Sequence, residues 1–259
     1  PSGRLGPMGG TSSTSWRGQR SAGLERWSAA LAHAEVAARA AGAVLAREFA
    51  RPGGPRGRDG RCVADAEAEL RIRDALRVAF PAWDYFGEET GFAPAESRSA
   101  PDAPYWLVDP NDGTAAFLGG HRGAAVSIAL VHRARPVLGV VFAHTPPICA
   151  PEPGGDCFAW AEGCGPVRRN GRPVQRTWPD ALSRDRTVLV SADADRAAEA
   201  NARLVAPARF RAVPSVAYRL ALVAAGEADA AVSVAAAVDF DYAAGHALLL
   251  GAGGDLLDA

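Results

Sequence analysis

The feature that most restricts how this chain can fold is a short apolar run that ends in acidic turn residues. The run 106–108 is typical of a buried strand, and it stops at Asp109-Pro110 and Asp112-Gly113, two dipeptides that favour turns. Gly113 lets a ligand approach the backbone closely, and the N–H groups that open a helix bind anions. Carboxylates for a cation beside amides for an anion suit a metal-assisted phosphate site, although an ordinary turn explains the same residues.

The first part of the chain predicts a leader followed by two helices. Residues 1–24 are rich in Gly, Ser, Pro and Arg and lack the apolar segment of a secretory signal, so we expect a disordered leader. Apolar residues recur at helical spacing from Trp27 to Phe49, and a second helix is expected from Asp65 to Phe80. No apolar run approaches the roughly 18 residues of a membrane span, so no membrane contact is expected.

The middle of the chain predicts an antiparallel sheet, and the end predicts alternating strands and helices. Strands are expected at residues 83–86, 124–131, 136–143 and 157–160, the last as an edge strand, with a tight turn at Asn170-Gly171. The alternation then places strands at 187–191, 210–213 and 229–234, and helices at 195–205, 215–225 and 241–250. We therefore expect two layered subdomains, residues 25–180 with the antiparallel sheet and residues 181–259 as an α/β unit.

Acidic residues stand at the ends of several expected elements. Asp65 and Asp241 open helices, Glu88 follows a strand, and Asp109 and Asp112 flank the central turn. Each has an ordinary explanation as a helix N-cap or a solvated surface group. If they converge, they repel one another unless a cation neutralises them, and an all-oxygen ligand set favours Mg²⁺ over zinc or copper.

The composition narrows the class of protein. The net charge is −1 over 259 residues, so nothing favours binding to a nucleic-acid polymer. The four cysteines have no C-x-x-C spacing, so we expect a reduced, cytoplasmic protein, with pairing of Cys157 and Cys164 as the alternative in an oxidising compartment.

Three motifs carry a resemblance to a known family. They are Gly87-Glu88-Glu89, the stretch 106–114 that contains Asp109-Pro110-Asn111-Asp112-Gly113-Thr114, and Phe240-Asp241 with the following Tyr-Ala-Ala-Gly. Together, and in this order, they resemble the motifs of the inositol monophosphatase family, which includes bisphosphate nucleotidases and histidinol-phosphate phosphatases. The likeness extends over nearly all of the chain from about residue 25 onward.

The resemblance implies a fold, a cofactor and a reaction. The implied fold is a five-layer α-β-α-β-α sandwich of mixed helices and sheets, usually in a homodimer. The implied activity is Mg²⁺-dependent, Li⁺-sensitive hydrolysis of a small phosphate monoester by metal-activated water, with two to three ions.

The resemblance also implies roles for individual residues. Metal ligands would be Glu88, Asp109, the carbonyl of Asn111, Asp112 and Asp241. Asp65 and Thr114 would activate the water, with Glu88 as a further catalytic group. The backbone N–H groups of Gly113 and Thr114 would bind phosphate, and Ser215, Arg219 and His121 are candidates for substrate contact.

Some of these assignments have alternatives. Ser215 also suits a helix N-cap, Arg219 a packing or surface role, and His121 a solvated loop. Asn111, Ala116 and Phe240 depart from the residues usual in the family, and residues 233–237 (Ser-Val-Ala-Ala-Ala) stand where the inositol branch has an acidic side chain. The main prediction is a phosphatase that acts on a small phosphate monoester. The alternatives are a 3′(2′),5′-bisphosphate nucleotidase and a catalytically weak relative that binds a phosphorylated ligand.

Overall fold

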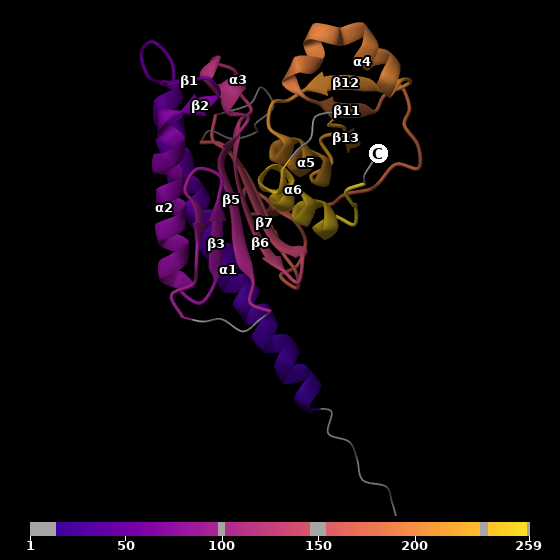
Figure 1. Cartoon of the computed structure of the whole chain (residues 1–259). Helices are drawn as coiled ribbons and strands as arrows, with labels where there is room; N and C mark the ends of the chain where they lie inside the picture. Colours follow the sequence, from indigo (N-terminus) through magenta and orange to yellow (C-terminus); the bar gives the residue numbers. More distant parts are fainter. Residues whose placement is uncertain (1–13, 98–101, 146–153, 234–237, 258–259) are drawn as a thin grey trace, which may run out of the picture.

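The computed structural model describes residues 14–97, 102–145, 154–233 and 238–257, and these form five layers of alternating helices and sheets (Figure 1). The first layer contains two long helices, α1 (Thr14–Phe49) and α2 (Val63–Ala79). They pack on one face of the larger sheet, while α5 (Val216–Ala224) and α6 (Asp239–Gly251) pack on its other face. The five-layer sandwich expected from the sequence is therefore confirmed.

The larger sheet has eight strands in the order β10-β9-β8-β7-β6-β5-β3-β4. Their bounds are β3 (Asp84–Gly87), β4 (Gly91–Ala93), β5 (Tyr105–Asp112), β6 (Ala125–His132), β7 (Arg135–Ala143), β8 (Asp156–Ala161), β9 (Arg168–Arg169) and β10 (Arg172–Pro173). Strands β3 and β5 pair in parallel, so the sheet is mixed and not purely antiparallel as expected. Strand β8 lies between β7 and β9, so the expectation that it is an edge strand is wrong.

The smaller sheet lies beyond α5 and has the order β12-β11-β13, with all pairs parallel. Its strands are β11 (Thr187–Val190), β12 (Arg209–Ala212) and β13 (Ala230–Ala231), and the outer layer consists of a 3-10 helix, η1 (Ala192–Ala197), and α4 (Ala198–Val205). Helices α5 and α6 share an apolar cluster with the larger sheet, while Val188, Val190, Val205 and Ala208 form a smaller cluster of their own. The division into residues 25–180 and 181–259 stays a prediction.

Two turns show how the sequence encodes the hairpins. The β6–β7 turn has no glycine, yet Arg133 and Ala134 both adopt positive φ. The turn between β9 and β10 uses Asn170 and Gly171 at positive φ, as the sequence predicted. A third hairpin, β1 (Gly57–Arg58) with β2 (Arg61–Cys62), leads into α2.

Three helices begin earlier than expected. Helix α1 starts at Thr14, inside the segment 1–24 that was predicted to be disordered, and no proline interrupts the sequence between Pro7 and Pro52. Residues 1–13 lie outside the described part of the chain. Helices α2 and α6 start two residues before Asp65 and Asp241, so both aspartates are third helical residues and not N-caps.

Helix α1 also corrects the expectation about apolar length. Its portion Trp27–Phe49 is long and apolar enough, by length and composition alone, to cross a membrane. Half of the most apolar 18-residue stretch of this portion is buried inside the protein, where α1 packs in the core of the first layer. A core helix passes the same test, so this portion is weak evidence for a membrane span.

Helix α6 lies unusually close to the sheet. A Cβ atom at Gly139 of β7 would stand 2.2 Å from the carbonyl oxygen of Ala244 and 2.9 Å from the Cβ of Ala247. A Cβ at Gly245 would stand 2.6 Å from the Cβ of Leu220 on α5. Two glycines therefore set how closely α6 packs against β7 and α5.

Candidate active site

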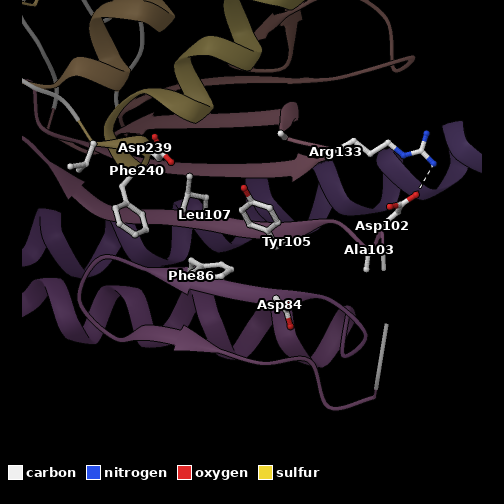
Figure 2. Close-up of a pocket in the computed structure, with 11 residues that line it drawn as sticks. Asp84, Phe86, Asp102, Ala103, Tyr105, Leu107, Arg133, Asp239 and Phe240 are labelled. Carbon is white, nitrogen blue, oxygen red and sulfur yellow. Dashed lines mark hydrogen bonds and ion pairs between the residues drawn. The ribbon is translucent and has the colours of Figure 1, made fainter. Parts of the chain in front are cut away.

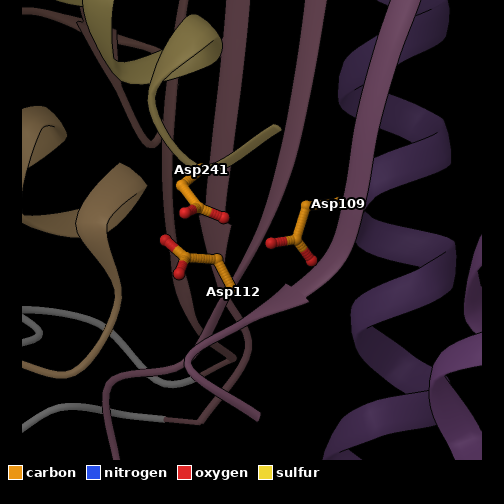
Figure 3. A group of neighbouring side chains, drawn as sticks. All are labelled: Asp109, Asp112 and Asp241. Atoms are coloured by element: carbon orange, nitrogen blue, oxygen red, sulfur yellow. The ribbon is translucent and has the colours of Figure 1, made fainter. Parts of the chain in front are cut away.

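A group of three carboxylates lies at the end of β5. Asp109 and Asp112 come from this strand and Asp241 from the first turn of α6, and one ligand oxygen from each lies within 4.8 Å of the others (Figure 3). The register of β5 against β6 shifts between Asp109 and Asp112, an irregularity at the point where both carboxylates enter the group. Residues more than 100 positions apart in the chain thus meet at one point.

Burial leaves these carboxylates electrostatically uncompensated. Burial, together with the charges of Asp112 and Glu88, holds the pKa of Asp109 well above its usual value. Burial raises the pKa of Asp112 to about 7, although hydrogen bonds from Ser215 and Ala217 favour its charged form. Burial also raises the pKa of Asp241. The group therefore favours either protons or a cation.

Glu88 reaches this group from the loop after β3. It is exposed, and its charge and a hydrogen bond between the two side chains act on Asp109. The loop is held by Glu69 of α2, which is fully buried and accepts the backbone N–H groups of Glu89 (2.7 Å) and Thr90 (2.8 Å) as well as the Thr90 hydroxyl. Gly87 leaves room for Glu69, because a Cβ there would stand 1.9 Å from Oε1. The sequence analysis missed Glu69, whose helical position looks like any other acidic residue of α2.

Asp65 and Thr114 form a second pair beside the group. Asp65 is 1% exposed, and its Oδ2 lies 3.1 Å from the Thr114 hydroxyl. The same hydroxyl lies 2.8 Å from the carbonyl oxygen of Asn111. Burial raises the pKa of Asp65 to about 7, while hydrogen bonds from Thr114, Asn111 and Cys62 favour its charged form. A carboxyl group with a pKa near neutrality can accept a proton at neutral pH.

The side chain of Asn111 is also part of the site, and the sequence analysis considered only its carbonyl. Its Nδ2 lies 3.0 Å from Oδ1 of Asp65, and its Oδ1 lies 3.0 Å from Nε2 of His144. His144 follows β7 in a segment that carried no motif, so only the folded chain brings it to residue 111.

Two candidates for substrate contact are buried. The hydroxyl of Ser215 donates to Oδ2 of Asp112 (2.6 Å) and accepts the N–H of Tyr218 (2.9 Å), and Ser215 is 0% exposed. The alternative role of Ser215 as the N-cap of α5 is confirmed, and its contact with substrate stays a prediction. Arg219 is buried as well, and its charge favours the ionised forms of Asp112 and Asp241. Its contact with substrate stays a prediction.

The remaining candidates lie around α3 (Thr114–Leu118), a short helix that follows the carboxylates. Gly113 precedes it with φ of 95°, and a Cβ there would stand 3.3 Å from the backbone nitrogen of Ser215. The first N–H groups of a helix have no intrahelical partner, so the predicted phosphate contacts of Gly113 and Thr114 stay possible. His121 is exposed on the loop after α3.

A cavity of about 900 Å³ lies along β5 next to the carboxylate group (Figure 2). Its lining includes Phe86, Tyr105, Leu107 and Phe240, with Leu107 two residues before Asp109. The charged residues of the lining are Asp84, Asp102, Asp239 and Arg133, and Arg133 is paired with Asp102 at 3.1 Å. This excess of negative charge does not suit a phosphate group.

The carboxylate group fits the metal that the sequence predicted. Three oxygen donors converge, burial and mutual repulsion hold protons on them, and no histidine or cysteine belongs to this group within the described residues. Hard oxygen donors of this kind suit Mg²⁺. Cys62, Cys157 and Cys164 are free thiols, and Cys149 lies outside the described residues.

Comparison with known families gives one match over most of the chain. The sequence model of the inositol monophosphatase family matches residues 27–259.

Individual relatives show the same likeness. The chain is 30% identical over 195 residues to the 3′(2′),5′-bisphosphate nucleotidase CysQ of Escherichia coli K12, which covers 75% of this chain and 74% of that protein. It is 40% identical to inositol monophosphatase 2 of Solanum lycopersicum over 78 residues, which span only 29% of that protein. The crystal structure of the extragenic suppressor protein suhB of Bartonella henselae superimposes with a TM-score of 0.72, at 26% identity and covering 88% of this chain and 86% of that one.

Proposed function

The chain belongs to the inositol monophosphatase family, whose members are metal-dependent phosphoric monoester hydrolases, and we propose that it hydrolyses a small phosphate monoester with Mg²⁺. The observation that carries the proposal is the meeting of Asp109, Asp112 and Asp241 within 4.8 Å. Such a buried group of carboxylates is costly without a cation, and phosphate esters need positive charge to offset the charge of the transition state.

The carboxylates would hold the metal ions. Asp109, Asp112 and Asp241 form the group, and Glu88 interacts with Asp109. The carbonyl of Asn111, which lies between the two strand aspartates in sequence, would be a further ligand. Bound Mg²⁺ would supply positive charge for the phosphoryl group and lower the pKa of water. We propose two to three ions, as the family pattern implies.

Asp65 and Thr114 would accept the proton that the attacking water loses. The Thr114 hydroxyl lies 3.1 Å from Oδ2 of Asp65, so it can pass its proton to the carboxylate while it accepts one from water. A pKa of about 7 on Asp65 places this acceptor near the working range of a general base. The N–H groups of Gly113 and Thr114 would bind the phosphate oxygens beside this pair.

The substrate class is proposed from the relatives. The relative from Escherichia coli is named as a 3′(2′),5′-bisphosphate nucleotidase, and that from Solanum lycopersicum as an inositol monophosphatase. Ser233 is exposed and uncharged where the inositol branch has an acidic side chain, which favours a nucleotide or another phosphate ester over inositol phosphate. Residues 234–237, which the same argument used, lie outside the described part of the chain.

The other properties follow from the family and the composition. We propose Li⁺ sensitivity, a homodimer, a cytoplasmic location, and no binding to membranes or nucleic-acid polymers. The burial of half of the apolar window in Trp27–Phe49, within the core of the first layer, supports the absence of membrane binding, and the net charge of −1 supports the absence of nucleic-acid binding.

Phosphate release from a panel of esters tests the function. The panel contains inositol 1-phosphate, histidinol phosphate and adenosine 3′,5′-bisphosphate, each with Mg²⁺ and with a chelator. We expect Mg²⁺-dependent release from at least one ester, and a loss of at least about 1,000-fold in kcat in Asp241→Asn with folding unchanged. A folded wild-type protein that binds Mg²⁺ but releases no phosphate from any ester would favour the catalytically weak binding protein.

A further inference from the structure

The side chains of Asn111 and His144 form a buried hydrogen-bonded pair, and Asn111 contacts the catalytic candidate Asp65. We propose that these two side chains are positioning residues that fix the Asp65 carboxylate against Thr114. The inference rests on the proposed hydrolase activity, since it assigns to Asp65 the handling of the proton.

Both the nitrogen and the oxygen of the Asn111 side-chain amide form hydrogen bonds. Nδ2 lies 3.0 Å from Oδ1 of Asp65, and Oδ1 lies 3.0 Å from Nε2 of His144. Asn111 is 1% exposed and His144 is 4% exposed, so water does not compete for these contacts. A buried amide with both ends bonded cannot rotate without leaving buried polar groups unpaired, which is unfavourable.

The two oxygens of Asp65 have different partners. Oδ1 accepts from the amide of Asn111, and Oδ2 meets the hydroxyl of Thr114 at 3.1 Å. The bond to Oδ1, together with the hydrogen bond from Cys62, limits the rotation of the carboxylate about its own axis. Without the bond from Asn111 this restraint weakens, and the Thr114 hydroxyl turns to its other acceptor, the carbonyl oxygen of Asn111 at 2.8 Å.

The direction of the amide fixes the protonation of His144. Because Nδ2 of Asn111 faces the Asp65 carboxylate, the oxygen of Asn111 faces His144; that oxygen can only accept, so Nε2 of His144 carries the proton. Nδ1 is buried and has no hydrogen-bond partner within the described residues, which agrees with a bare lone pair at that atom. The ring packs edge-on against Phe117 at 5.5 Å.

The reversed amide is excluded by its contact with Asp65. Its oxygen would face Oδ1 of the Asp65 carboxylate, and two acceptors would then meet at 3.0 Å. At the other end of the amide, Nε2–H of His144 holds the oxygen. His144 therefore acts on Asp65 through Asn111, although it does not touch it.

Substitution of His144 separates positioning from plain stability. His144→Gln keeps an N–H donor at the end of a side chain of similar reach, whereas His144→Leu removes it and keeps the site apolar. We expect His144→Leu to lower kcat about 10-fold with KM and Mg²⁺ affinity unchanged, and His144→Gln to restore most of that loss. Trp178→Phe, which removes a hydrogen bond to the carbonyl of Ala252, is the control and should leave kcat unchanged.

A double-mutant cycle tests the route through Asn111. Asn111→Leu alone should lower kcat by a similar factor, and adding His144→Leu should cost little more, because the same contact to Asp65 is already lost. Equal losses in His144→Leu and His144→Gln, additive losses in the cycle, or a lower melting temperature with unchanged kcat would each overturn the proposal.

A second readout does not depend on turnover. Nitrogen-15 NMR of the wild-type protein should show His144 in the Nε2–H form, and Asn111→Leu should remove this preference. The opposite tautomer in the wild-type protein would overturn the proposal, even if no ester is hydrolysed. A protein with the expected tautomer but no activity on the panel would count only against the proposed hydrolase.

Discussion

Two buried aspartate sites on the larger sheet show opposite solutions to the same physical problem. Asp156 at the start of β8 is fully buried, and both of its oxygens accept from the guanidinium of Arg169, at 2.8 Å and 2.7 Å. Asn170 and the hydroxyl of Tyr218 add hydrogen bonds at 3.2 Å and 3.1 Å. Asp109 is equally buried but faces two other carboxylates.

The difference separates a structural carboxylate from a functional one. At Asp156 the chain supplies its own cation, so this charge is compensated wherever the protein folds. At Asp109 the chain supplies repulsion from Asp112 and Glu88, and at Asp112 the charge of Arg219 does not offset burial, so the remaining compensating charge must come from outside. Buried groups whose pKa is displaced by burial and by like charges are typical of functional sites.

The largest effect is expected when the repulsion is removed. Asp109→Asn should lower kcat at least about 1,000-fold, because a ligand of the proposed metal is lost. It should also raise the stability of the metal-free protein at pH 8, because a buried charge disappears while the contact to the N–H of Asn111 at 2.7 Å can be kept. Phosphate release and denaturant unfolding in a chelator measure the two effects.

The exposed Asp74→Asn on α2 is the control for this variant and should change neither quantity. If Asp109→Asn lowers the stability of the metal-free protein, the carboxylate is compensated by the protein and the contrast with Asp156 fails.

Removing the cation at the compensated site should have the opposite result. Arg169→Met leaves Asp156 buried with hydrogen bonds only, so the free energy of unfolding should fall by about 3–5 kcal/mol. The kcat of the molecules that remain folded should be unchanged, because Asp156 takes no part in the proposed reaction. Urea unfolding and phosphate release at low temperature measure both.

Arg135→Met serves as the matched control, since its pair with Glu162 is exposed and should contribute no more than about 1 kcal/mol. Equal losses of stability in the two variants would mean that burial does not distinguish the Asp156 pair.

Metal removal should make stability depend on pH in a defined direction. The pKa values of Asp65 and Asp112 are raised from 3.8 to about 7 in the folded protein, so the folded state binds more protons than the unfolded state between these values. The melting temperature in a chelator should therefore fall as pH rises from about 4 to about 7. Mg²⁺ at about 100 times its Kd should add about 2.7 kcal/mol at pH 8, and less at pH 5.

Scanning calorimetry across this pH range, with and without Mg²⁺, makes the measurement. A melting temperature that rises with pH in the chelator would contradict the assignment of uncompensated carboxylates.

The smallest effect is expected at Glu69, where a buried carboxylate is satisfied by N–H and O–H donors. Glu69→Gln places an NH₂ group among these donors, so the loop that carries Glu88 should lose order and Mg²⁺ affinity should fall about 10-fold. Glu67→Gln, an exposed change on the same helix, is the control. Isothermal titration with Mg²⁺ measures both, and equal affinities would show that Glu69 does not order the loop.

The sequence predicted the parts of the fold that depend on local patterns. The apolar runs of β6 and β7 and the Asn170-Gly171 turn were placed to within a few residues, because apolar runs and turn chemistry are local signals. The parallel pairing of β3 with β5 was missed, because β4 lies at the edge of the sheet and β5 enters on the other side of β3, an order that neither strand alone determines.

The candidate site was predicted in the same uneven way. Asp109, Asp112 and Asp241 carry motifs, and their convergence was expected. The side-chain contacts of Asn111 were not, because His144 lies 33 residues away and carries no pattern that marks a polar partner. Ser215 was expected as an N-cap and is one, and its hydroxyl also donates to Asp112, a contact that no local pattern predicted.

The close contact at Gly139 has a consequence for how the protein can change over generations. The position of Asp241 depends on a helix that rests directly on bare backbone, so a single methyl group at residue 139 would have to displace α6 or β7. Such a substitution touches no proposed ligand, yet it would move Asp241 relative to Asp109 and Asp112. A lineage that retained every acidic residue could still lose the enzyme at this glycine, and a search for inactive relatives should inspect it first.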